Sequence, residues 1–156
     1  MSQKSGMYAA FQNDSSLEQD GIWYHFLGNG ADFKVKVARA GGGNIAYAKT
    51  LDQKTKHLKR AIEAQALGPD LQMEVMKDVY ASCMIKGWKV RQGNTETGEP
   101  KYVDGIESPT GELLPATREN ILKVFKDLPD VFQEVLETSR AAYLFREVIA
   151  EEEEKN

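Results

Sequence analysis

The sequence has few of the residues on which several classes of protein depend. It contains one cysteine, Cys83, which excludes an internal disulfide and a metal site built from several cysteines. The two histidines, His25 and His57, are far apart, and no HExxH, GxSxG or paired-histidine motif occurs. No run of about 18 apolar residues is present, so we expect no membrane span. We therefore expect neither an enzyme nor a protein with a metal or cofactor.

The length and composition are typical of a single globular domain. The chain has 156 residues, of which 41% are hydrophobic and 28% are charged, with a net charge of −4. Residues 1–20 are polar and lack the apolar core of a signal peptide, so we expect a flexible arm and no secretion. We expect one globular domain over residues 21–150 and an acidic, frayed tail over residues 151–156.

A β-hairpin is predicted after the arm. Residues 22–27 are mostly aromatic or β-branched, and Gly28-Asn29-Gly30 supplies the positive backbone angles of a tight turn. Over residues 31–40 apolar and basic side chains alternate, which predicts a strand with one buried face and one basic face. The stretch Gly41-Gly42-Gly43-Asn44 lacks the ending of a phosphate-binding loop, so we interpret it as a hinge with Asn44 as a helix N-cap.

Helical periodicity then dominates the sequence, so the predicted fold class is α+β and mainly α. Amphipathic patterns predict helices over residues 45–66 and 70–88, and Pro69 suits the first turn of the second. Residues 89–116 are predicted to be a long irregular loop, in which segments near 88–91, 102–103 and 113–114 could add strands to the hairpin. Thr117 and Pro129 open two further helices, so the hairpin packs on about four helices.

Charge is distributed unevenly along the chain. Residues 34–60 hold eight Lys or Arg and one acid, whereas residues 127–156 hold nine acids and three bases. Opposed charges favour weak self-association. We expect Lys56, Lys59 and Arg60 to contribute to this self-association or to charge steering. The same basic helix could contact phosphates, but no aromatic residues alternate with its lysines for base stacking, so nucleic acid is not an expected partner.

The order of these motifs resembles that of a known family. The strand Lys36-Val37-Ala38-Arg39-Ala40, a second helix ending in Gly87-Trp88, and a last helix opening with Leu128-Pro129-Asp130-Val131-Phe132 occur in this order. Over residues 21–156 the chain resembles the tail assembly chaperones of long-tailed, siphophage-type bacteriophages. It departs from them in its long N-terminal arm and in an extended loop around residues 92–112.

The resemblance implies a non-enzymatic role in tail morphogenesis. Such chaperones keep the tape-measure protein soluble and recruit tail-tube subunits, partly through a longer product made by −1 ribosomal frameshifting. They act in the host cytoplasm and are absent from the mature virion. The ending Glu154-Lys155-Asn156 can be encoded as GAA AAA AAC, which contains a slippery heptamer in the correct frame.

A chaperone of this kind needs an apolar face for its client. The second and last helices have the broadest apolar surfaces in the sequence, so we expect the partner-binding residues there. They are Met76, Tyr80, Phe132, Leu136, Tyr143 and Ile149. The alternative for all six is that they form the core of the domain itself. The alternative function is a structural virion component, such as a head–tail connector or tube-associated protein, or, less favoured, a nucleic-acid-binding regulator.

Overall fold

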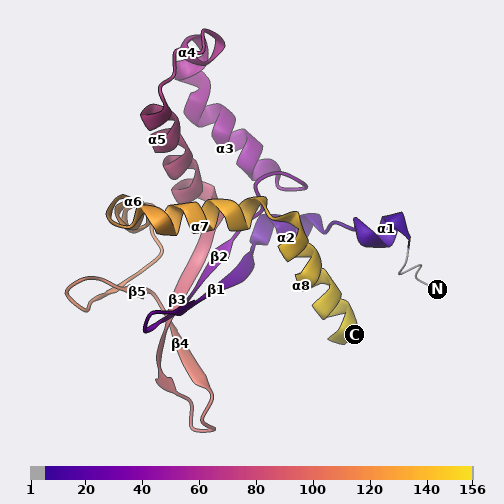
Figure 1. The fold of residues 1–156 in the computed structure, drawn as a ribbon, viewed down its shortest axis with the longest axis vertical. Coiled ribbons are helices and arrows are strands. Elements are labelled where there is room, and N and C mark those ends of the chain that lie inside the picture. Colours follow the sequence, from indigo (N-terminus) through magenta and orange to yellow (C-terminus); the bar gives the residue numbers. More distant parts are fainter. Residues whose placement is uncertain (1–5, 156) are drawn as a thin grey trace.

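The computed structural model describes residues 6–155 and has a four-stranded antiparallel sheet at its centre (Figure 1). The strands lie in the order β1 (Ile22–Gly28), β2 (Ala31–Val37), β3 (Ile85–Asn94) and β4 (Pro100–Asp104). Helices are inserted between β2 and β3, and others follow the strands after β4. The predicted fold class, α+β and mainly α with an N-terminal hairpin, is confirmed.

The β1–β2 hairpin follows directly from the alternation in its sequence. Asn29 and Gly30 have φ values of 50° and 77°, as the tight turn requires. This turn sets a register in which Tyr24 pairs with Val35 and Trp23 pairs with Lys36. One face of the hairpin is therefore apolar and buried, and the other carries lysines, as predicted.

Residues 45–79 form a helical arm that projects from one end of the sheet (Figure 1). The expected helix over 45–66 is interrupted: α3 (Ile45–Thr55) passes through a 3-10 turn, η1 (Lys56–Leu58), into the short α4 (Lys59–Glu63). Thr55 Oγ1 donates to the Leu51 carbonyl at 2.7 Å, a side-chain bond that bends helices at this point. The chain returns along α3 as α5 (Pro69–Val79), which Pro69 opens as predicted.

The second helix was predicted to run to residue 88, and this predicted C-terminal end was wrong. After α5 the helix widens into a π-helical turn, η2 (Tyr80–Met84), and Ile85 begins β3. Gly87 and Trp88 are therefore strand residues, paired with Lys36 and Val35. A short apolar run fits a buried helix and a buried strand equally well, and here the exposed edge of β2 decides between them.

Most of the predicted irregular loop is also sheet. β3 continues to Asn94, pairs with β4 after a turn, and is followed by a small second sheet of β5 (Ile106–Glu107) and β6 (Leu113–Leu114). Trp88 Nε1 donates to the Leu114 carbonyl at 2.8 Å, which fastens this second sheet to the first. The strands predicted near 88–91 and 102–103 are thus present in longer form in the sheet of the hairpin, whereas the segment 113–114 pairs with β5 instead.

The single last helix of the prediction is two helices. α6 (Arg118–Asp127), capped by Thr117, leads into α7 (Pro129–Arg140), and α8 (Ala142–Lys155) follows after a break at Ala141. The Ser139 carbonyl accepts the Ala40 N–H at 2.8 Å, and Ala141 has left the helical conformation with a ψ of 84°. In a continuous helix the Ser139 carbonyl would accept a hydrogen bond from a backbone N–H of the next turn. Here it accepts the Ala40 N–H instead, so the helix is interrupted.

The main core lies between the apolar face of the sheet and the helices α6 and α7. It includes Val35, Val37 and Trp88 from the sheet, Tyr80 and Met84 from the π-helical turn, and Ile121, Phe125 and Phe132 from the two helices.

The described parts of the two terminal segments contain helix where an arm and a frayed tail were expected, while residues 1–5 and 156 lie outside the described part of the chain. α1 (Met7–Ala10) and α2 (Ser15–Asp20) lie before β1, and the Glu18 side chain of α2 is only 1% exposed. Glu18 pairs with Arg39 and accepts the Gly43 N–H at 3.0 Å. The glycine-rich loop is thus held by a carboxylate of the chain itself. At the other end, α8 remains helical through the exposed residues 151–155.

The expected Asn44 cap takes a different form. Asn44 occupies the N-cap position of α3, but its side chain makes no capping hydrogen bond. Its amide instead donates to the Arg39 carbonyl at 2.9 Å and faces the Met84 sulfur at 3.7 Å. Asn44 therefore secures the loop to the core, where it is 4% exposed.

Candidate functional site

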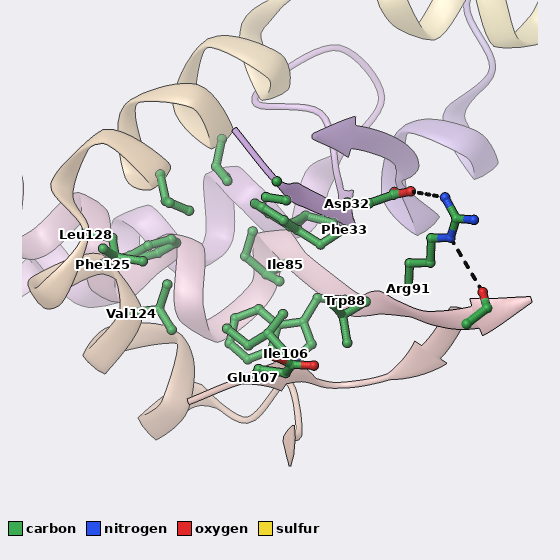
Figure 2. A pocket seen from close by; sticks show the side chains of 17 residues that line it. Asp32, Phe33, Ile85, Trp88, Arg91, Ile106, Glu107, Val124, Phe125 and Leu128 are labelled. Atoms are coloured by element: carbon green, nitrogen blue, oxygen red, sulfur yellow. Dashed lines mark hydrogen bonds and ion pairs between the residues drawn. The ribbon is translucent and has the colours of Figure 1, made fainter. Parts of the chain in front are cut away.

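A cavity of about 610 Å³ lies between the apolar face of the sheet and the helices α6 and α7 (Figure 2). Its walls are mainly apolar side chains from β2, β3, β5, α6 and α7. They include Phe33, Val90, Ile106, Val124, Leu128 and Val131. The volume is within the range of sites that hold a small ligand or a few side chains of a partner.

The mouth of the cavity is formed where α6 meets α7. Pro129 occupies the first turn of α7 and keeps Leu128 out of the helical conformation, with φ −130° and ψ 75°. The Leu128 side chain is 54% exposed although it lines the cavity. An apolar side chain at this position would lose its contact with water if a partner covered it.

The polar part of the lining is concentrated at the outer end of the hairpin. Arg91 Nη1 lies 3.5 Å from Asp32 Oδ2, and Arg91 Nε donates to the Gly93 carbonyl at 3.5 Å (Figure 2). Glu107 is exposed on the β5 side. Strand alternation directs the Asp32 and Arg91 side chains to the opposite face of the sheet, so these two residues only border the cavity at its outer end and its interior is apolar.

Most of the residues that we expected to bind a partner lie inside the domain. Tyr80, Phe132, Leu136 and Ile149 are each no more than 9% exposed, so they cannot meet a partner while the domain is closed. Burial raises the pKa of Tyr80, whose hydroxyl lies 2.5 Å from Ser139 Oγ. The structure thus favours the alternative interpretation of these four residues as core.

The two other expected residues are more accessible. Met76 is partly exposed on α5 and packs against the core. Tyr143, at the start of α8, is 61% exposed. Neither lines the cavity between the sheet and α6–α7, so that cavity was missed by the sequence interpretation.

The three residues proposed for self-association are together at the tip of the arm. Lys56, Lys59 and Arg60 are all exposed, on η1 and α4. Nearer the sheet, Asp78 joins the arm to α6: it accepts from Arg118 Nη2 at 2.7 Å and lies 3.3 Å from Lys54 Nζ. Burial alone would raise the pKa of Asp78, but these two cations outweigh it and lower that pKa.

His25 has an acidic neighbour that the sequence interpretation did not find. Its Nε2 lies 2.6 Å from Asp32 Oδ1, and the Tyr102 hydroxyl donates to the same oxygen at 2.9 Å. The hydrogen bond from His25 is the main cause that lowers the pKa of Asp32. Counting back through the Asn29-Gly30 turn places the two side chains diagonally across the hairpin, so the pair was detectable from the register.

Metal sites and membrane-spanning helices were sought in the part of the chain that the structure describes. Among residues 6–155, no three His, Cys, Asp or Glu side chains are placed to hold a metal ion. No described helix is both long and apolar enough to span a bilayer.

The comparison with protein families gives the origin of the chain. A family model described as YdaY prophage protein matches residues 42–156, nearly three quarters of the sequence. The chain belongs to the YdaY prophage protein family. The match begins in the glycine-rich loop and includes the helical arm, β3, β4 and both walls of the cavity contributed by α6 and α7. No curated protein and no solved structure matches the chain.

Proposed function

We propose that this prophage protein is a non-enzymatic tail assembly chaperone that holds an apolar segment of the tape-measure protein in the cavity between the sheet and α6–α7. The observation that carries the proposal is the cavity itself, with Leu128 exposed at its mouth in a chain of phage origin. The order of sequence motifs that resembles siphophage chaperones supports the choice of client.

The cavity suits a client that must later be released. Its interior gains affinity by removing apolar surface from water, at about 25 cal/mol per Å², but it offers few polar groups that fix one sequence. Such a site binds many similar segments of a long helical client with modest affinity. Tail-tube subunits could then displace the chaperone, which would act in the host cytoplasm and leave no copy in the virion.

Co-expression with the tape-measure and tail-tube proteins of the same prophage tests the proposal. We expect soluble tape-measure protein to be recovered on the tagged chain, and little of it to be soluble without the chain. Leu128→Lys should reduce this recovery by about tenfold or more, because a charge would then occupy the apolar mouth. Far-UV circular dichroism of each variant checks that it is folded.

Two matched variants distinguish the possible surfaces. Ile45→Lys introduces the same charge at a side chain that is 61% exposed but lies at the start of α3, away from the cavity, and should leave recovery unchanged. Tyr143→Ala tests the expected binding residue on α8. If Tyr143→Ala abolishes recovery and Leu128→Lys does not, the client binds to α8 and the cavity has another role.

The alternative, a structural virion component, makes the opposite prediction about the particle. A connector or tube-associated protein would be detected by mass spectrometry in purified virions, whereas a chaperone would not. Presence of the chain in virions together with no recovery of tape-measure protein would overturn the chaperone proposal. The gene supplies a separate check on the frameshifted product, because GAG before the Lys155 codon, or AAG for Lys155, would remove the slippery heptamer.

A further inference from the structure

The second face of the central sheet is left uncovered by the helices and carries aromatic and basic side chains together. Strand alternation places them on the side opposite the core, and none of them belongs to the core cluster. They are Trp23, Lys34, Lys36, Lys89, Arg91 and Tyr102. We call this surface the open sheet face.

Trp23 offers a flat, accessible ring on this face. Its side chain is 41% exposed, whereas the other tryptophan, Trp88, is 4% exposed on the core side. The indole reaches across the sheet to β3, where a Cβ added to Gly87 would lie 3.6 Å from its Cη2 atom. The absence of a side chain at Gly87 therefore leaves room for the ring beside the neighbouring strands.

A lysine ammonium group lies over each aromatic ring. The Nζ atom of Lys89 lies 4.0 Å from the Trp23 ring centroid, and that of Lys36 lies 5.9 Å from it. On β4, the ring of Tyr102 has Lys34 Nζ at 4.2 Å. Each aromatic ring thus has a lysine of another strand over its face, at a distance typical of cation–π contacts.

The open sheet face carries more basic than acidic side chains, since its four Lys or Arg residues outnumber Asp32 and Asp104, the second of which lies opposite Lys89. Asp32 forms an ion pair with Arg91, accepts the Tyr102 hydroxyl and lies 2.6 Å from His25 Nε2. Lys34, Lys36 and Lys89 form no ion pair with any carboxylate among the residues that the structure describes. In a chain of net charge −4, three such lysines on one sheet face are a local concentration of positive charge.

We propose that the open sheet face binds single-stranded nucleic acid, with bases stacked on Trp23 and Tyr102 and phosphates held by Lys34, Lys36 and Lys89. Exposed aromatic rings with interspersed cations are the two elements that single-strand binding requires, and neither element selects a particular base. The site is thus sequence-tolerant, and its affinity falls with added salt.

An acidic peptide is the other anion that such a face could attract. The four consecutive acids 151–154 of a second copy would be one example. A carboxylate chain would use the lysines, but it would gain little from flat aromatic rings. The presence of both rings beside the lysines favours nucleic acid, and the peptide becomes an outcome of the test.

The test is a titration of the full chain with a fluorescein-labelled oligothymidylate of about 16 nucleotides. Binding is monitored by the anisotropy of the fluorescein label and by the fluorescence of the tryptophans. We expect binding at low ionic strength, with quenching of the exposed Trp23. Trp23→Ala should weaken binding by about 5- to 100-fold, and Trp23→Phe should retain most of the affinity, because the phenyl ring still stacks.

Charge variants separate this face from the basic arm. Lys36→Gln and Lys89→Gln should each lower the slope of log affinity against log salt by about 0.7. Lys49→Gln and Lys126→Gln remove the same charge from exposed positions on α3 and α6, to which no binding role is assigned, and should change neither slope nor affinity. Equal losses from both pairs would show that binding follows net charge alone and would overturn the assignment.

Two further outcomes would also overturn the proposal. One is no anisotropy change at low salt with the folded wild-type chain. The other is polyglutamate that displaces the oligonucleotide at equal charge concentration, which would assign the face to acidic peptides. Leu128→Lys should bind the oligonucleotide like the wild type, so failure of this proposal and failure of the chaperone proposal are distinguishable.

Discussion

The Tyr80 hydroxyl lies 2.5 Å from Ser139 Oγ and joins the π-helical turn to the last turn of α7. Both side chains are fully buried, and Ser139 Oγ also donates to the Leu136 carbonyl at 2.7 Å. Ser139 therefore has a partner of its own, so it can only accept from Tyr80. Removing the Ser139 hydroxyl should therefore lower the free energy of unfolding by a different amount from removing the Tyr80 hydroxyl.

We expect Ser139→Ala to destabilise the protein more than Tyr80→Phe. Tyr80→Phe removes one hydrogen bond but leaves Ser139 donating to Leu136, at a cost of about 1 kcal/mol. Ser139→Ala leaves the buried Tyr80 hydroxyl without its acceptor, at a cost of about 1–3 kcal/mol. Urea denaturation of both variants and of the double variant measures the difference. Equal costs would show that the Tyr80 hydroxyl finds another partner in the folded state.

Asp78 predicts a pH dependence of stability. Its folded-state pKa is lowered, so its contribution is fully present above the unfolded pKa of about 3.9 and is lost as the pH falls through the folded value. At pH 7, Asp78→Asn should cost about 1 kcal/mol, because the contacts with Arg118 and Lys54 are partly exposed. At pH 3 the difference from the wild type should be smaller. Asp52→Asn, which removes one carboxylate from an exposed position on α3, is the matched control.

Gly43 tests how firmly the N-terminal residues are attached. A Cβ at Gly43 would lie 2.9 Å from Ser15 Cα, so Gly43→Ala must push α2 away from the glycine-rich loop. We expect a loss of about 1–3 kcal/mol in the free energy of unfolding. Gly68→Ala is the control, since nothing lies within 4 Å of its Cβ and its φ of −66° suits alanine. If the two variants are equally stable, α2 moves freely and residues 1–20 are the flexible arm that the sequence predicts.

The elements that could be predicted from the sequence are those decided by neighbouring residues. The hairpin follows from alternation and from the Asn29-Gly30 turn, and the starts of α5 and α7 follow from Pro69 and Pro129. The errors came where a distant segment decides. Ile85 to Trp88 become a strand because β2 pairs with them, and α7 ends because Ala40 takes the Ser139 carbonyl.

The candidate sites were harder to predict for the same reason. The cavity is lined by residues from two strands of the main sheet, from β5 and from two helices, which no local pattern connects. On the open sheet face, Trp23 and Lys89 are 66 positions apart in the numbering, yet the cation lies over the ring. A search for aromatic residues among lysines within one segment therefore could not find this surface.

The direct succession of α5, the π-helical turn and β3 has a mechanical consequence. No loop separates the helical arm from the strand that is hydrogen-bonded to both β2 and β4. A load applied at the tip of the arm, near α4, is therefore transmitted through α5 into the middle of the sheet. The hydrogen bonds of β3 to its two neighbouring strands therefore resist a pull on the arm.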